Sequence, residues 1–111
     1  MQTSFLDPGM LCHELSLQFA LRIDDGSGGF AENWSELATV FARIEPAGAK
    51  SLFAAGQRLE QATHNITIRF RDDVTSGMRF EKSGRTFLIL NVTDPDETGR
   101  YLICITREDA R

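Results

Sequence analysis

The sequence has few of the residues from which catalytic and metal sites are built. It contains two histidines and two cysteines, and the cysteines are not in a Cys-x-x-Cys pair. No serine lies in a Gly-x-Ser-x-Gly motif, and the glycine-rich segment 26–29 lacks the Lys-Ser/Thr pair of a phosphate-binding loop. We therefore expect no catalytic residues, no metal site and no cofactor.

Long hydrophobic runs are also absent. No apolar stretch approaches the roughly 20 residues that a membrane-spanning helix needs, and the first ten residues lack the basic and apolar regions of a secretion signal. We expect no membrane partner and a reducing compartment, in which Cys12 and Cys104 stay unlinked. Both are interpreted as small buried apolar side chains.

An excess of basic charge is missing as well. The chain has 12 Lys+Arg and 16 Asp+Glu, and the formal net charge is −4. Residues 1–60 hold four basic and eight acidic residues, whereas residues 61–111 hold eight of each. This balance argues against a protein that derives its affinity from neutralising many phosphates. The acidic first half is either an ordinary solvated surface or a face that does not retain anions.

What the sequence does contain is a series of alternating segments. Its 111 residues predict one domain, 1–111, with a core of its own, and residues 1–10 are expected to be a flexible N-terminus. Apolar and polar residues alternate from Leu11 to Ile23, which is typical of a β-strand with one buried face. Turn-forming residues at 24–29 end this strand, and residues 30–33 lead into a second strand, with apolar members from Trp34 to Ile44, which Pro46 ends.

Further strands are expected in the second half. His64, Ile66, Ile68 and Phe70 alternate with polar residues, and a short strand from Met78 to Glu81 is followed by a tight hairpin at 82–85. Segment 86–92 is more continuously apolar, as in a strand buried on both faces, and 101–106 places Tyr101, Ile103 and Ile105 on one face. The pattern predicts an all-β fold, a small antiparallel barrel of about six strands.

One long connection interrupts this series. Segment 45–61 is rich in helix-forming residues but contains Gly48 and Gly56, so we expect at most a short helix, with Ser51 as its cap. Leu52 and Phe53 have no obvious place in the core. Long connections in compact domains are usually functional or mobile.

The remaining candidate groups favour structural roles. His13 and His64 stand at apolar-face positions, and Asp94, Asp96 and Glu97 have the composition of an exposed turn rather than the spacing of a calcium loop. The one basic grouping consists of Arg69, Arg71, Arg79 and Arg85. It is interpreted either as a solvated face with internal ion pairs or as an interface.

Several motifs resemble those of a known family. The segment 34–46, WSELATVFARIEP, resembles the W-x-x-x-A-T-V-W-A-R-I-E-P segment of phage head–tail joining proteins, also called head-closure, stopper or head–tail adaptor proteins. Segments 48–57 and 63–71 are similar to the family's G-x-E-x-F-x-A-G-Q and T-H-x-I-T-I-R-Y-R. The order continues with 78–80, 84–87, 94–96 and Arg100. The chain departs from the pattern at Phe41, where the family often has Trp, and at Ser51, where it often has Glu.

The resemblance covers about residues 11–108 and implies a non-enzymatic structural protein. It implies a homo-oligomeric ring beneath the portal and adaptor of a tailed phage head, which closes the DNA-filled capsid and provides a docking surface for the tail. The implied partners are portal or adaptor proteins, tail proteins, and genomic DNA that passes without sequence-specific binding. The implied location is the head–tail connector of the virion, with assembly in the host cytoplasm, and the gene could equally belong to a prophage.

In that family the long connection reaches towards the channel and neighbouring subunits, which by position is 45–61 here. The subunit or partner interface is therefore predicted to include five residues of this segment: Lys50, Leu52, Phe53, Gln57 and Arg58. Polar contacts are predicted for Arg69 and Arg71.

The alternative is a small β-barrel module that binds nucleic acid through Arg69, Arg71, Arg79 and Arg85 and neighbouring aromatic rings. The negative net charge is unfavourable for it, and strand alternation places Phe70 opposite Arg69 and Arg71. Binding of single strands with a steep salt dependence would distinguish it from a structural protein.

Overall fold

The fold was obtained as a computed structural model that describes residues 10–24, 26, 30–47, 53–54, 57–58, 62–95 and 97–109. Every regular element in this part is a β-strand, and no helix in it is long and apolar enough to cross a membrane. The strands are β1 (His13–Asp24), β2 (Phe30–Pro46), β3 (Phe53–Ala54), β4 (Gln57–Arg58), β5 (His64–Arg69), β6 (Arg79–Lys82), β7 (Arg85–Thr93) and β8 (Tyr101–Asp109).

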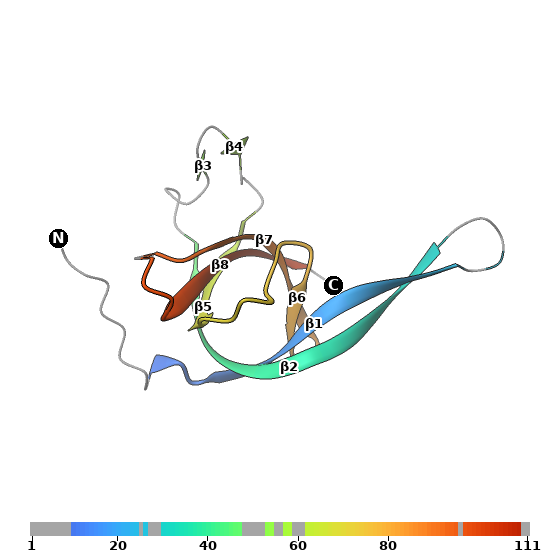
Figure 1. Cartoon of the computed structure of the whole chain (residues 1–111), viewed down its shortest axis with the longest axis horizontal. Coiled ribbons are helices and arrows are strands. Elements are labelled where there is room, and N and C mark those ends of the chain that lie inside the picture. Colours follow the sequence, from blue (N-terminus) through green and yellow to red (C-terminus); the bar gives the residue numbers. More distant parts are fainter. Residues whose placement is uncertain are drawn as a thin grey trace.

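Six of these strands close into a barrel. Their order is β1-β2-β5-β8-β7-β6, and each neighbouring pair is antiparallel (Figure 1). β3 and β4 form a separate two-stranded hairpin within the connection from β2 to β5. The prediction of a small antiparallel barrel of about six strands is confirmed.

The core lies inside the barrel and is supplied by alternate residues of its strands. Because successive side chains of a strand point to opposite faces, each strand contributes every second residue to the interior. The side chains less than 2% exposed are Phe80, Phe87, Leu15, Leu17, Ile66, Ile68, Ile89, Thr106 and Cys104. Thr106 satisfies its buried hydroxyl by donating to the backbone carbonyl of His64 at 2.9 Å.

One strand agrees with the expectation about its faces and one differs. β8 has Tyr101, Ile103 and Ile105 on one face, as expected, and this half-buried face is the outer one. Its Leu102 and Cys104 turn inward, because they pair with inward residues of β5. β7 was expected to be buried on both faces, which is wrong. Phe87 and Ile89 are buried, whereas Leu88 and Leu90 are only half-buried on the outside of the barrel.

The hairpin between β6 and β7 forms as the sequence predicts. Ser83 and Gly84 connect the strands with φ values of 52° and 84°, and positive φ at both central residues is the geometry of a type I′ turn, whose twist matches that of the strands. The Gly84 amide also donates to the Glu81 carboxylate at 3.1 Å.

β1 and β2 extend well beyond the barrel. β1 pairs with β6 only at Ser16–Gln18, and β2 pairs with β5 only at Ala42–Pro46. Past Gln18 the two strands pair only with each other among the described residues, 19–24 with 30–35, and they project to the right in Figure 1 as a two-stranded ribbon. We call residues 19–24 and 30–37 the arm.

A β-bulge marks the point where the arm leaves the barrel. Leu17 pairs with Ala38 but Gln18 pairs with Glu36, so that Leu37 is an extra residue in β2. A bulge of this kind bends its strand and increases the local twist. The bulge therefore lets one pair of strands belong both to the barrel and to a ribbon outside it.

The two cysteines differ in environment. Cys104 is buried, as expected, and burial raises the pKa of its thiol to about 12. Cys12 is an exposed free thiol, so the expectation of burial was wrong for it. It precedes β1 and points away from the interior that its neighbour Leu11 helps to line.

Candidate functional site

The most exposed apolar side chains lie in two places. Among the described residues, five large hydrophobic side chains are at least 40% exposed. Leu21 and Leu37 belong to the arm. Phe41 and Phe70 lie where β2 and β5 separate, and Met10 immediately precedes Leu11 of the same region. Such side chains are stabilised by contact with another molecule, so the arm and this second region are candidate interaction surfaces.

The base of the arm is held against the barrel by one arginine. The guanidinium of Arg79, in β6, lies 4.2 Å from the centroid of the Trp34 ring, and its Nε donates to the Gln18 side-chain oxygen at 2.7 Å. A cation above an indole face is attracted by the ring quadrupole. Arg79 thus connects both strands of the arm to a third strand and fixes where the arm emerges.

The arm is acidic as well as apolar. The segment 19–37 contains four acidic residues and one arginine, and Glu32 and Glu36 are exposed. Glu36 accepts a hydrogen bond from the Thr39 hydroxyl at 2.9 Å. A binding partner for this surface would need apolar contacts together with positive charge.

The second region is a cleft of about 460 Å³ lined by Leu11, Thr39, Val40, Phe41, Arg69, Phe70 and Arg71. It forms because β5 ends at Arg69, while β2 continues beyond its last pairing with β5, Ala42 with Ile68. Thr39 to Phe41 pair with β1 on one side of β2. On the other side, which β5 covers from Ala42 onwards, they have no partner strand among the described residues. We call this region the cleft.

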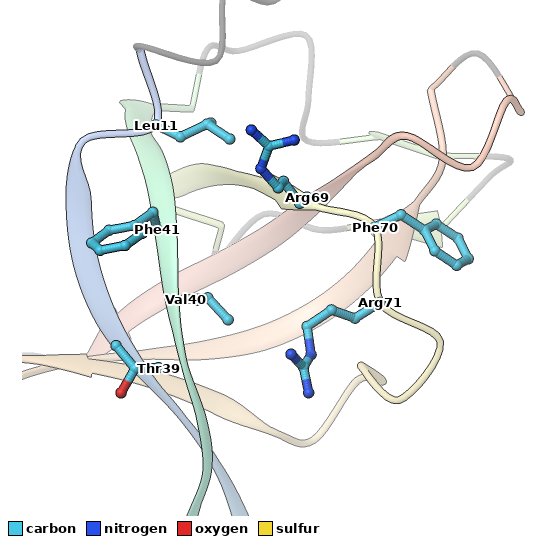
Figure 2. Close-up of a pocket in the computed structure, with 7 residues that line it drawn as sticks. All are labelled: Leu11, Thr39, Val40, Phe41, Arg69, Phe70 and Arg71. Carbon is cyan, nitrogen blue, oxygen red and sulfur yellow. The ribbon is translucent and has the colours of Figure 1, made fainter.

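The side chains of the cleft combine charge and aromatic surface. Figure 2 shows the Arg69 and Arg71 side chains reaching into the space beside β2, while the rings of Phe41 and Phe70 point outwards on opposite sides of it. Phe70 is 43% exposed, whereas strand alternation placed it on the apolar face of β5. The reason is that β5 ends one residue earlier.

The two arginines of the cleft have different partners. Arg71 donates from Nε and Nη2 to the two carboxylate oxygens of Asp73, both at 2.9 Å. This pairing lowers the pKa of Asp73 and raises that of Arg71. Arg69 forms no ion pair with the residues that the structure describes, and so its charge is available to a ligand.

The other two arginines of the basic grouping lie elsewhere. Arg79 is at the base of the arm. Arg85 forms a paired hydrogen bond with Glu108, at 2.8 and 3.1 Å, and lies over the Phe87 ring. These hydrogen bonds lower the pKa of Glu108 and raise that of Arg85. The four arginines therefore do not form one basic groove, which disfavours the nucleic-acid-binding alternative.

His64 and the acidic turn have structural surroundings. The His64 ring packs edge-to-face on Phe87, with 5.3 Å between ring centroids, and its Nδ1 lies 2.9 Å from the Thr63 hydroxyl. Asp94 accepts a hydrogen bond from the Gly99 amide at 3.0 Å, which closes the turn from 94 to 99. Within the described residues, no three His, Cys, Asp or Glu side chains are grouped so that they could hold a metal ion.

The predicted site residues are only partly covered by the structure. Lys50 and Leu52 lie outside the described residues, and so does Ser51, the expected helix cap. Phe53 pairs with Arg58 between β3 and β4, next to Gln57, so the described part of this connection is a hairpin. Arg69 and Arg71 both line the cleft, although Arg71 lies beyond the end of β5 and not on the same strand as Arg69.

The arm and the cleft were not predicted from the sequence as sites. Leu21 continues the alternation of Leu15 and Leu17 without interruption, so nothing local distinguishes it from a core residue. The alternation around Phe41 could have indicated one of these surfaces. Val40 and Ala42 occupy the inward positions of the strand, so Phe41 between them faces outwards.

One family model matches most of the chain. A family model described as "Phage head completion protein" matches residues 6–109. No curated protein sequence matches the chain. A chain in the structure titled "Virion of native gene transfer agent (GTA) particle" is 27% identical, with a TM-score of 0.65, and the match covers 89% of this chain and 96% of that one.

A second solved structure is protein SF1141 from Shigella flexneri 2a, determined in solution. It is 26% identical with a TM-score of 0.74, and the match covers 96% of this chain and 99% of that one. The fold, the family model and the virion chain together define a β-barrel protein with a structural role in the phage head. The chain belongs to the phage head completion protein family, which agrees with the resemblance found in the sequence.

Proposed function

We propose that this protein forms a ring that closes the DNA-filled phage head and offers the docking surface on which the tail assembles. The observation that carries the proposal is the family match over residues 6–109. The similarity to a chain of the gene transfer agent virion particle supports it, because the similar barrel belongs to an assembled particle. The ring would assemble in the host cytoplasm and remain in the connector of the virion.

In a ring of identical subunits, each copy binds one neighbour through one surface and the other neighbour through a different surface. The ring therefore requires two distinct interaction surfaces on each copy. The chain has two exposed apolar regions, the arm and the cleft. Docking of portal, adaptor and tail proteins would use the remaining surface.

DNA passing through such a ring must not be retained. Residues 1–60 hold eight acidic and four basic residues, and acidic side chains repel phosphates instead of releasing their counterions. We infer that the first half of the chain contributes to the wall of the channel, with no sequence-specific contact. The same proposal applies to a prophage-encoded copy.

The connection 45–61 is proposed as a contact with neighbouring subunits, through Lys50, Leu52, Phe53, Gln57 and Arg58. Replacing Leu52 and Phe53 together by Asp places two charges in an apolar interface and is expected to abolish the joining of filled heads to tails. Replacing both by Ala is the milder matched variant. Normal particle yield from the Asp variant would contradict this assignment of the interface.

Electron microscopy of particles made without this protein tests the overall proposal. We expect tailless heads that package DNA and then lose it, with full recovery when the protein is supplied in trans. Heads that keep their DNA and acquire tails without the protein would overturn the proposal. A nucleic-acid-binding function would instead be indicated by single-strand affinity that falls steeply with salt.

A further inference from the structure

The arm and the cleft have complementary properties. The arm carries the exposed Leu21 and the acidic Glu32 on a ribbon that is unpaired along both edges within the described residues. The cleft carries exposed phenyl rings, the Arg69 guanidinium and an unpaired edge of β2 from Thr39 to Phe41. Both surfaces have exposed apolar side chains and an unpaired strand edge, and their charges are opposite.

The two surfaces also lie at opposite ends of the molecule. In Figure 1 the arm projects to the right, whereas the start of β1 and the end of β5 lie on the left of the barrel. An arm that leads away from its own cleft cannot fill it. A copy placed beside the first, in the same orientation, brings its arm to the cleft end of its neighbour.

We propose that the arm of one copy docks in the cleft of the next copy, so that the occupant of the cleft is a second copy of this chain. This inference rests on the proposed ring and states which surfaces form it. The contact is heterologous, because arm meets cleft and not arm, and contacts of this kind repeat around a closed ring.

Three kinds of interaction stabilise the contact. Leu21 is removed from water against the apolar lining of the cleft on the side of Phe41. The edge of the arm aligns with the unpaired β2 edge at Thr39–Phe41, where backbone groups of the two copies pair as in strand addition. Glu32 of the arm approaches Arg69, whose charge has no partner among the residues that the structure describes.

Exposed aromatic rings and an unpaired strand edge, rather than charge, separate this proposal from a contact with DNA. DNA phosphates would approach Arg69 as well, but the exposed Phe41 and Phe70 rings and the short unpaired strand edge favour a polypeptide. The segment 19–37, with four acidic residues and exposed apolar groups, is a polypeptide of the required charge.

A cross-linking experiment in complete particles tests the contact. Cys12 is exposed and directly follows Leu11 of the cleft, whereas Cys104 is buried and its raised pKa keeps it unreactive. A Leu21→Cys variant treated with a short bismaleimide is expected to give dimers and higher multimers of this chain. Links within one copy are excluded, since Cys12 and residue 21 are separated by about 30 Å of extended chain.

The control is Leu21→Cys combined with Cys12→Ser, which should give no multimers. Cross-links from Cys12 to a different virion protein, or no cross-links in particles that are complete, would overturn the proposal. In both cases the particles themselves show that the proposed head-closing function still holds, so the two failures are distinguishable.

A charge exchange provides the second test. Glu32→Arg alone and Arg69→Glu alone each place like charges in contact and should lower the yield of DNA-retaining heads about tenfold or more. The combined variant restores opposite charges and should recover most of the yield. Lys82→Glu, which changes the charge equally on the β6–β7 hairpin, should have no effect. Equal losses in the single and combined variants would overturn the pairing.

Discussion

The pair of strands β1 and β2 behaves differently inside the barrel and beyond it. Leu15 and Leu17 are 1% and 0% exposed, whereas Leu21, four residues after Leu17 on the same strand and in the same alternation, is 45% exposed. The difference in exposure arises because a third strand, β6, lies beside β1 at Leu17 but not at Leu21. Up to Gln18, β6 lies beside β1 and the barrel encloses the apolar face. Past this residue only β2 lies beside it.

Burial is therefore a property of the barrel's closure and not of the strand. Leu17 contributes to folding of the single chain, because its neighbours are supplied by the same molecule. Leu21 has the same chemistry but lacks those neighbours, so its apolar surface is available to another molecule. The comparison separates residues that stabilise the fold from residues that serve assembly.

Truncation of the two leucines should give the largest contrast. Leu17→Ala leaves a cavity in a fully buried site and is expected to lower the free energy of unfolding by about 2–5 kcal/mol. Leu21→Ala should change it by less than about 0.5 kcal/mol, as for other exposed positions, while it weakens particle assembly. Urea denaturation of the purified variants measures both values. Equal losses of stability would show that the arm is part of the folding unit.

Removal of the Arg79 side chain tests the junction between the two regions. Arg79→Ala abolishes the contact with Trp34 and the hydrogen bond to Gln18, and should cost about 1–2 kcal/mol. Trp34 is the only tryptophan, so its fluorescence reports on the junction and should shift to longer wavelength as water reaches the ring. Lys82→Ala, on the same strand, is the control and should leave the emission unchanged. An unchanged spectrum in Arg79→Ala would show that the arm is positioned by other contacts.

The smallest effect is expected within the barrel wall, at the Arg85–Glu108 pair. The hydrogen bond from Arg85 lowers the pKa of Glu108 from its ordinary 4.5, so the pair's contribution to stability is complete above that pH. The contribution is lost as the pH falls through the lowered pKa. Wild type and Glu108→Gln should therefore differ slightly at neutral pH and converge in acid. Arg85→Gln should show the same convergence, and a difference that persists in acid would exclude the ion pair as its cause.

Much of the barrel could be predicted from local patterns. The alternation of β1 and β5, the stop at Pro46 and the Ser83–Gly84 turn each depend on a few neighbouring residues, and the structure confirms these elements. Which face of β8 is inward depends instead on its register with β5, since Cys104 pairs with Ile66. Apolar residues stand on both faces of β8, so composition alone could not identify the inner one.

The candidate surfaces were harder to predict for the same reason. Arg69 and Arg71 were predicted to make polar contacts, but the cleft that they line also needs Leu11 and the β2 edge, which are far away in sequence. The arm could not be recognised, because its residues continue the pattern of the barrel strand and the end of β6 pairing is set by the tertiary structure. The proposed contacts of the connection 45–61 remain predictions.

The junction between barrel and arm has a mechanical consequence. Three register pairs, Ser16–Gln18 with Arg79–Glu81, join β1 to β6, and this is the shortest ladder of the barrel. Its last pair, Gln18 with Arg79, lies at the base of the arm. A pull on the arm is therefore transmitted first to the seam at which the barrel closes. We expect β1 and β6 to separate first when a subunit is pulled, before any other pair of strands. Hydrogen exchange at the backbone amides of this seam should therefore increase when an assembled ring is under tension.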